Sequence, residues 1–480
     1  MTSTKNRDPV EHTAGEALAA FAEGRLTAAA LARALVERSR QLDWLNALIG
    51  PVSEKLVTEA EAADRRRAAG RSAGPLDGLP IVIKDNIDLA GWPTTAGTPG
   101  LAGHRPQRSA PVAAALLGAG ALLLGKTNMH ELAYGITSNN GAYGPVRNPY
   151  DVRLIAGGSS GGTGAAIAAR MAPAGLGSDT GGSVRIPAAL CGTAGLRPTI
   201  GRYPQSGIVP ISHSRDTAGP MARCVADLAL LDGIIANDLT PLQPLPLKGL
   251  KFGLPRETHF ESVEPSVAAV MEETFARLRQ AGAELIEADL PGLRELLRDT
   301  GRKIAFYETI TDLPRYLVAS GADASFERIV AELGSPDVAA IFDQMLKQRV
   351  TDAEYRTALE DRLPRVKTLY REYFARHGVA AVMFPATVLP ARPIGQDDLV
   401  TLCGRKVPTF AAYLRNTEPA TIAGIPGVVL PAGLTPNGLP VGLELDGPAE
   451  SDRRLLAIAA SIEALLSPLP APRPDPGLLR

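Results

Sequence analysis

Apolar positions recur with two different periods along the chain, and the two periods predict helices mixed with strands. A capping box at Thr13–Glu16 precedes apolar residues at helical spacing, so a helix is expected to begin there. A second helix is expected over Thr27–Gln41, and a third, more polar one over 53–67. The short apolar run Leu79–Lys84 is flanked by turn residues, which predicts a buried strand whose last residue is charged.

Helical and strand patterns alternate over the rest of the chain. Helices are expected over 112–117, 225–236, 264–281 and 451–466, and strands over 120–125, 250–254, 284–287, 380–384, 427–430 and 441–445. The last two strands flank Asn437-Gly438, a dipeptide typical of hairpin turns. This alternation favours an α/β fold, with a central mixed β-sheet covered on both faces by helices. Residues 292–375 are helix-rich and more highly charged, and are interpreted as a helical insertion or cap.

The residues best suited to chemistry are concentrated between Gly157 and Gly192. Ser159 and Ser160 form one cluster among glycines, Ser183 stands in a second, and the segment between them fits one helix followed by one short strand. That layout is expected to bring two serine-bearing turns together. Glycine-rich turns allow backbone N–H groups to converge on one point, which is the arrangement that stabilises an oxyanion.

Composition and net charge limit the kinds of molecule that the protein is expected to bind. Hydrophobic residues make up 45% of the 480 residues and charged residues 21%, which is ordinary for a globular enzyme with a large core. Lysine plus arginine (50) against aspartate plus glutamate (51) leaves a formal charge of -1. A chain with so small a net charge has no strong electrostatic field, so it is expected to act on a small, roughly neutral molecule. Neither nucleic acid nor a membrane surface is an expected partner.

Cysteine usage and the N-terminus bear on location and cofactors. Three scattered cysteines are too few for a disulfide framework or a paired-ligand zinc site, so Cys191, Cys224 and Cys403 are interpreted as core thiols. The first 16 residues lack the apolar segment of a secretory signal, which makes the cytoplasm the expected location. The longest apolar run, 110–124, is shorter than the roughly 20 residues that span a bilayer. No pattern calls for a metal or another cofactor.

Two other catalytic patterns are present and are interpreted as coincidental. Residues 120–127, GALLLGKT, match the Walker A phosphate-binding pattern, but the apolar interior predicts a buried strand instead of a polar loop. Residues 158–162, GSSGG, match the nucleophile elbow of α/β-hydrolases, which would need a histidine base such as His213, His259 or His377. None of these histidines stands in a recognisable catalytic context.

Three motifs together resemble the amidase signature family: Lys84 at the end of a strand, GGSSGG at 157–162 and GSDTGGSVRIPA at 177–188. The similarity is clearest up to Met221, where RDTAGPM closes the family's core region. Further motifs, such as LPVGLELDGPAESDRRLL at 439–456, look like the branch of indoleacetamide and mandelamide hydrolases. The resemblance implies a single amidase domain over 1–480, with N-terminal helices over 1–70, a catalytic core over 76–221, the insertion over 292–375 and a poorly ordered tail over 468–480.

Catalysis in that family uses a serine, a second serine on a cis peptide bond, and a lysine. Position by position, these fall on Ser183, Ser159 and Lys84. The separation 183 − 159 = 24 matches the family's spacing and favours Ser159 over Ser160 as the cis serine. By the same resemblance, the oxyanion hole falls on the backbone N–H groups of Thr180, Gly181, Gly182 and Ser183, and the supporting positions are Ser160, Asp179 and Arg185.

The acyl pocket implied by the resemblance is walled by residues 129–139 and by the variable region. Tyr134, Ile136 and Thr137 are the candidates from the first segment, with Phe306 or Tyr307 from the helical insertion. An aryl-substituted acetamide would then be the substrate, giving ammonia and a carboxylic acid. Burial of Lys84 would keep its amine uncharged, so that a proton can pass from Ser183 through Ser159 to Lys84.

Other functions stay open from the sequence alone. The same three residues would also cleave esters, carbamates or anilides. A glutaminase-like subunit of a transamidation complex would use them to release ammonia for a partner, and a scaffold that has lost activity would use the fold alone. The oligomeric state is also open, with a homodimer among the alternatives.

Overall fold

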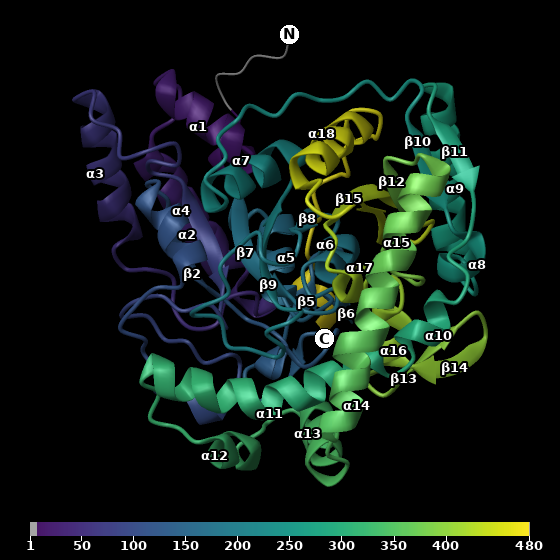
Figure 1. The fold of residues 1–480 in the computed structure, drawn as a ribbon. Coiled ribbons are helices and arrows are strands. Elements are labelled where there is room, and N and C mark those ends of the chain that lie inside the picture. The colour runs from purple at the N-terminus through teal and green to yellow at the C-terminus, as the bar shows by residue number, and fades with distance from the viewer. Residues whose placement is uncertain (1–6, 480) are drawn as a thin grey trace.

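The computed structural model describes residues 7–479 and is built around a ten-stranded mixed sheet (Figure 1). In spatial order its strands are β11 (Glu284–Glu287), β10 (Lys251–Leu254), β12 (Ala381–Pro385), β16 (Pro440–Asp446), β15 (Gly427–Leu434), β8 (Ala194–Arg197), β9 (Thr217–Ala222), β7 (Ala174–Asp179), β1 (Pro80–Lys84) and β2 (Leu122–Thr127). The first three strands are parallel to one another, as are the last three, and every other neighbouring pair is antiparallel. The predicted mixed sheet is therefore confirmed.

Helices cover both faces of this sheet, and the alternation of side chains along β15 shows how. Val428 and Leu430 belong to the largest apolar core, together with residues of α7 (Val225–Ile235) and α18 (Asp452–Glu463). Val429 points the other way, into a cluster with residues of α5 (Gly161–Ala168) and α6 (Arg185–Cys191). Both faces are thus apolar, which is why the central strands read as continuous hydrophobic runs.

The N-terminal helices form as their caps predict. They are α1 (Ala14–Ala22), α2 (Ala28–Gln41) and α3 (Leu56–Ala68), with α4 (Pro111–Gly118) leading into β2. Thr13 and Glu16 make the reciprocal bonds of a capping box, and the Thr27 hydroxyl accepts from the Ala30 N–H. The strand β1 is buried along its whole length and ends at Lys84.

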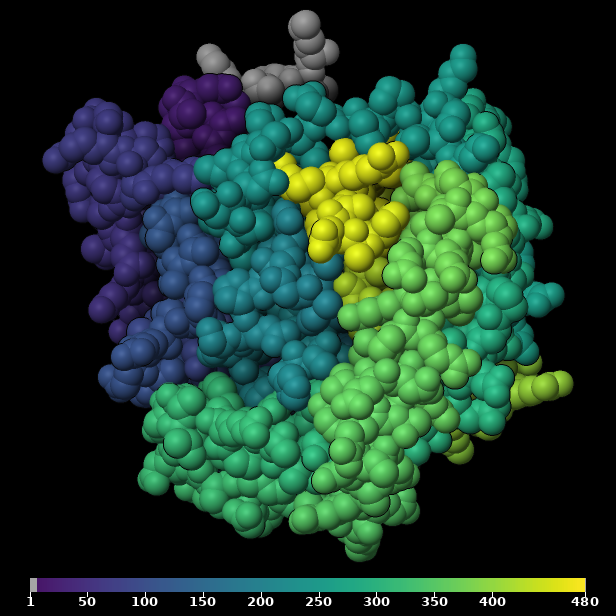
Figure 2. Space-filling view, in the orientation of Figure 1, coloured from purple at the N-terminus to yellow at the C-terminus, as the bar shows by residue number. Residues whose placement is uncertain are grey.

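Residues 292–375 form the predicted helical insertion. Its helices are α10 (Leu293–Leu297), α11 (Thr300–Ser320), α12 (Phe326–Ala331), α13 (Pro336–Lys347), α14 (Asp352–Arg356) and α15 (Leu363–His377), with a π-helical turn over Thr357–Arg362. In Figure 2 these green segments form the lower part of the molecule and continue up its right side, packed against the blue and teal core. Two apolar clusters of their own, one centred on Phe342 and one on Tyr370, join the insertion to the core.

The remaining helices and short strands lie outside the ten-stranded sheet, in the segments that connect its strands. They are α8 (Arg256–His259), α9 (Pro265–Gln280), α16 (Thr409–Leu414), α17 (Glu418–Ala423), the hairpin β13 (Leu399–Leu402) and β14 (Arg405–Pro408), and the short strands β3 (Asn139–Asn140), β4 (Gly144–Pro145), β5 (Arg147–Asn148) and β6 (Asp151–Ile155). The hairpin predicted at Asn437-Gly438 joins β15 to β16. Beyond α18, the proline-rich end is held to the core where the Tyr150 hydroxyl donates to the Pro470 carbonyl at 3.1 Å.

Two expectations from the sequence differ from the structure. The segment TAGPMA was not expected to be a strand, yet as β9 it pairs with β7 along all six of its residues and with β8 on its other side. Its glycine and proline give it weak strand propensity, so tertiary pairing decides its conformation. Cys403 is exposed, so only Cys191 is a fully buried thiol and the interpretation of three core thiols is wrong. Over residues 7–479, no helix is both long and apolar enough to cross a membrane.

Candidate active site

Lys84 lies at the carboxyl end of β1, with its amine turned to Ser159 and to Ser178 in β7. Its side chain is fully buried, and Nζ is 2.7 Å from Ser159 Oγ and 2.8 Å from Ser178 Oγ. Asn86 Nδ2 donates to the same Ser178 hydroxyl at 3.0 Å. A buried lysine thus stands among hydroxyl groups, without a carboxylate within salt-bridge distance among residues 7–479.

Burial sets the protonation of this amine. Loss of water lowers the pKa of Lys84 to about 7, against a smaller opposing attraction from the carboxylates of Asp179 and Asp216. A large fraction of the amine is therefore uncharged near neutral pH and can accept a proton.

Ser159 stands in a tight turn directly before α5. The Gly158–Ser159 peptide bond is cis, and the Ser159 carbonyl accepts from the His130 N–H at 3.1 Å. The next residue, Ser160, donates its N–H to the carbonyl of Ser183 at 3.0 Å. This hydrogen bond joins the two serine turns directly, as the layout of one helix and one strand predicted.

Ser160 and Ser178 tie the first turn to the end of β7. Ser160 Oγ donates to the Ser178 carbonyl at 3.1 Å and accepts from the Ser178 N–H at 3.3 Å. The neighbouring Gly177 leaves no room for a side chain, since a Cβ there would lie 2.8 Å from Ser160 Oγ. Sequence reasoning missed Ser178; its position in a serine- and glycine-rich segment at the end of a predicted strand was the available signal.

The turn Thr180–Ser183 has free backbone donors and borders a cavity through Thr180, Gly181 and Ser183. Within residues 7–479, the N–H groups of Thr180, Gly181, Gly182 and Ser183 have no hydrogen-bond acceptor. Gly182 has φ +149°, and a Cβ on it would come within 2.2 Å of Thr417 Oγ1. Free backbone donors beside a serine hydroxyl are what an oxyanion hole requires.

A buried network of charges fixes the two ends of this turn. Asp179 accepts from the Val184 N–H at 3.2 Å and pairs with Arg185 at 3.1 Å and Arg197 at 3.0 Å, and all three charged side chains are fully buried. Burial alone would raise the pKa of Asp179, but the two guanidinium groups hold it well below its usual range. Arg185 also pairs with Glu444 on β16, so the network reaches the middle of the sheet. Asp179 and Arg185 therefore hold the loop from behind, at positions where they do not line the cavity.

The cavity in front of Ser183 has a volume of about 470 Å³. Its apolar wall comes from α10, α11, α13, α16 and two loop segments, and includes Ala133, Ile136, Ile211, Leu297, Phe306, Ile341, Phe410 and Leu414. Polar groups at its border include Arg215, Asp299, Arg302 and Glu418. An apolar hollow of this size beside a serine and free N–H donors fits the acyl part of a small substrate.

Three of the five expected pocket residues line this cavity, and two do not. Tyr134, Ile136 and Phe306 are in its wall. Thr137 is turned aside because its hydroxyl donates to Asp397 at 2.7 Å. Tyr307 follows Phe306 on α11 but faces away, where it stacks on Tyr355 with ring centroids 3.9 Å apart. Successive side chains on a helix point about 100° apart, so only one of the two aromatic residues can face the cavity. Without a strong helical periodicity, the sequence does not show which one does.

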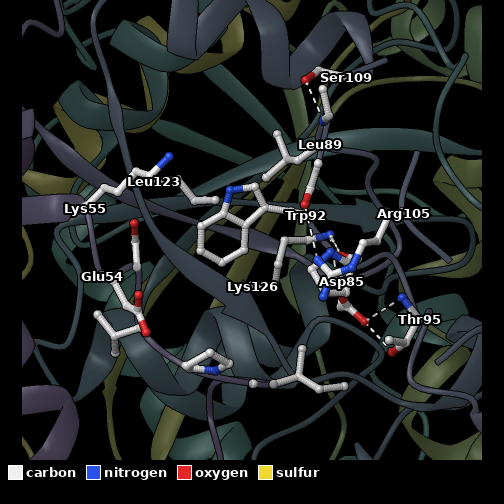
Figure 3. A pocket seen from close by; sticks show the side chains of 18 of the residues that line it. Glu54, Lys55, Asp85, Leu89, Trp92, Thr95, Arg105, Ser109, Leu123 and Lys126 are labelled. Carbon is white, nitrogen blue, oxygen red and sulfur yellow. Dashed lines mark hydrogen bonds and ion pairs between the residues drawn. The ribbon is translucent and has the colours of Figure 1, made fainter. Parts of the chain in front are cut away.

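A larger cavity, of about 920 Å³, lies at the β2 edge of the sheet (Figure 3), and neither Ser159 nor Ser183 lines it. Its floor contains Lys126, whose Nζ is 3.2 Å from Asp85 and donates to the carbonyls of Ile87 and Pro93 at 2.9 and 3.0 Å. These contacts use the lysine of the GALLLGKT segment, and most of that segment is the buried strand β2. The Walker A match is therefore coincidental, as expected.

The histidines do not complete a hydrolase triad. His213 lies between Asp312 and Glu308 at 2.8 and 3.4 Å, and this trio is the cluster best placed to ligate a metal within residues 7–479. His259 is stacked on Phe384, and burial lowers its pKa to about 3. His377 packs on Tyr373. None of these rings is hydrogen-bonded to Ser159, Ser160 or Ser183 in the part of the chain that the structure describes.

Comparison with known proteins agrees with this geometry. Residues 30–456 match the family model named Amidase. The chain is 44% identical over 438 residues to an indoleacetamide hydrolase of Agrobacterium vitis, covering 91% of this chain and 93% of that protein. It is 39% identical over 478 residues to a mandelamide hydrolase of Pseudomonas putida, covering 96% and 93%. Its fold matches that of a peptide amidase solved with the competitive inhibitor chymostatin, with a TM-score of 0.83 and 30% identity over 96% of this chain and 99% of that one. This chain is an enzyme that acts on carbon–nitrogen bonds, and it belongs to the amidase signature family.

Proposed function

We propose that this enzyme hydrolyses a small aryl-substituted acetamide to a carboxylic acid and ammonia, with Ser183 as the nucleophile. The observation that carries the mechanism is the 2.7 Å contact between the buried amine of Lys84 and Ser159 Oγ. A serine hydroxyl is a weak nucleophile at neutral pH and needs a proton acceptor as it attacks. An uncharged lysine, reached through a second serine, supplies that acceptor.

The reaction has two steps, formation of an acyl-enzyme and its hydrolysis, and every proton is accounted for in both. As Ser183 Oγ bonds to the amide carbon, its proton moves to Ser159 Oγ, and the proton of Ser159 moves to Lys84 Nζ. The same chain returns a proton to the leaving nitrogen, so that the C–N bond breaks with neutral ammonia as the leaving group and an acyl-enzyme remains. Water then attacks the acyl carbon by the same route and releases the acid. The free N–H groups of Thr180–Ser183 support the negative charge on the carbonyl oxygen in both steps.

The choice of an aryl acyl group has two supports. The cavity at Ser183 is walled by Phe306, Phe410, Ile136 and other apolar side chains, and its volume of about 470 Å³ accommodates a ring system. The relatives described above are named for an indole-bearing and a phenyl-bearing amide. Both names describe an aromatic group one carbon away from the carboxamide.

The test is ammonia release by the purified chain, without partner proteins, from indole-3-acetamide, mandelamide, phenylacetamide, acetamide and glutamine. We expect kcat/KM to be highest for the three aryl amides, and Ser183→Ala to abolish turnover of each. Preference for glutamine, or turnover only after a partner protein is added, would favour a transamidation subunit instead. Matched aryl esters and anilides in the same panel measure how far the site prefers amides.

A further inference from the structure

Asp216 is a buried carboxylate directly before β9, and it is hydrogen-bonded to Thr180, the first residue of the active-site turn. Its Oδ1 accepts from the Thr180 hydroxyl at 2.6 Å. Its Oδ2 accepts from the N–H groups of Ile211 and Ser212 at 2.8 and 2.9 Å. Only 7% of the residue is exposed, so the carboxylate is committed to these three donors.

The Asp216–Thr180 hydrogen bond lies between two hollows of the molecule. Thr180 lines the cavity of about 470 Å³ that contains Ser183. Asp216 lines a smaller cavity of about 210 Å³, together with His213, Asp312 and Arg315. The bond is thus part of the partition that separates the substrate cavity from the smaller one.

We propose that Asp216 is a positioning residue for amide hydrolysis: through Thr180 it aims the backbone donors of the Thr180–Ser183 turn, and its negative charge acts on Lys84. This inference rests on the proposed function, because both targets belong to the proposed machinery. Asp216 itself does not line the substrate cavity, so it acts through these two neighbours.

The charges around Asp216 define the sign of its effect on Lys84. Burial raises the pKa of Asp216 to about 6, and the carboxylate of Glu308 on α11 adds to this. The other charged groups near it are Lys84 on β1, Arg215 in its own loop, and His213, Asp312 and Arg315 at the small cavity. Arg215 is engaged with Glu418 at 3.2 Å. Above pH 6 an ionised Asp216 attracts the Lys84 ammonium, and this attraction raises the pKa of Lys84. Loss of the charge would therefore lower that pKa.

The experiment measures kcat against pH for Asp216→Asn, Thr180→Val and Thr180→Ser, on an aryl acetamide that the wild-type enzyme turns over. Asp216→Asn keeps the shape of the side chain. We expect it to lower kcat by about 10- to 100-fold, the cost of a misaimed turn, and to move the rising limb of the profile to lower pH. Thr180→Val should lower kcat in the same range with a smaller movement of the limb, and Thr180→Ser should restore kcat because it keeps the hydroxyl.

Asp312→Asn is the matched control, since it removes a carboxylate from the same small cavity without touching Thr180. It should leave both kcat and the position of the limb close to wild type. The proposal would be overturned if Asp216→Asn had the same dependence of kcat on pH as the wild type. It would also be overturned if Asp312→Asn moved the rising limb of that pH profile as far as Asp216→Asn does. Inactivity of the wild-type enzyme on all amides would refute the proposed function instead. Thermal unfolding of each variant identifies any that fails to fold, and comparison of Thr180→Val with Thr180→Ser then tests the contact without a change at Asp216.

Discussion

Thr417 Oγ1 donates a hydrogen bond of 2.7 Å to the carbonyl of Gly181, across a separation of 236 residues in the sequence. The residue directly before α17 thereby fixes the centre of the turn that borders the substrate cavity. Leu414 packs on the same turn, because a Cβ on Gly181 would lie 2.8 Å from its Cδ1. The active-site turn is therefore closely packed at Gly181 and Gly182, against Leu414 and Thr417.

This packing predicts that Gly182→Ala is inactive. The new methyl group would collide with the Thr417 side chain, and a φ of +149° is unfavourable for alanine. Displacement of the turn by about 1 Å is enough to cost about 100-fold in kcat. Gly103→Ala is the control, since a Cβ at that position has nothing within 4 Å. If Gly182→Ala turned over amide as fast as Gly103→Ala, the turn would not be the oxyanion hole.

The environment of Lys84 predicts a pH profile. An ammonium cannot accept a proton, so kcat should rise with pH through a midpoint near the pKa of about 7. Lys84→Met, which keeps the apolar stem and removes the amine, should lose at least about 100-fold in kcat, in the range assigned to general acid–base catalysis. Steady-state rates from pH 5 to 9 provide the measurement. A flat wild-type profile would remove Lys84 from the role of base.

Ser159 and Ser178 both contact the Lys84 amine, but the proposed relay passes only through Ser159. Ser159→Ala should therefore lower kcat by about 100-fold or more, with little change in KM. Ser178→Ala removes one hydrogen-bond partner of the amine and leaves the path intact, so a loss of about tenfold is expected, equivalent to one such bond. Single-turnover kinetics compares the two. Equal losses would mean that the two hydroxyls serve the amine alike.

Adjacent aromatic residues of α11 provide a matched pair for the acyl pocket. Phe306→Ala removes an aromatic ring from the wall of the cavity and should raise KM for aryl acetamides far more than for acetamide. Tyr307→Ala, in the neighbouring position, removes the stack on Tyr355 and the hydrogen bond to Asp352, both outside the cavity, and should leave turnover of both substrates unchanged. The measurement is the ratio of kcat/KM for phenylacetamide to that for acetamide. An unchanged ratio in Phe306→Ala would place the aryl group elsewhere.

Substitution of Asp179 is expected to lower the stability of the fold strongly. Replacing it by asparagine leaves the buried guanidinium groups of Arg185 and Arg197 without their shared carboxylate, which costs about 3 to 5 kcal/mol of unfolding free energy. The exposed pair Lys347–Asp343 is the control, because Asp343→Asn at the surface should change stability by less than about 1 kcal/mol. Chemical denaturation followed by circular dichroism measures both. Similar values for the two variants would show that the buried network adds little.

Sequence patterns predicted much of the fold where the local signal is strong. The caps at Thr13 and Thr27 and the Asn437-Gly438 hairpin form as expected, because each depends on bonds between residues near one another in the chain. The buried strand ending at Lys84 also forms as expected, because its continuous apolar run marks it although its partners β2 and β7 are distant in the chain. The strand β9 was not predicted, because its sequence favours no strand and its conformation depends on partners on both sides.

By itself, the sequence determined which residue types stand at which spacing: a lysine closing an apolar strand and two serine turns one helix and one strand apart. Only the tertiary structure decided which groups surround them. Ser178, Thr417 and Asp216 reach the site from the ends of strands and from helices far away in the chain, and Phe306 faces the cavity while its neighbour does not. Spacing along the chain is local, whereas contacts of this kind depend on the packing of the whole sheet and its helices.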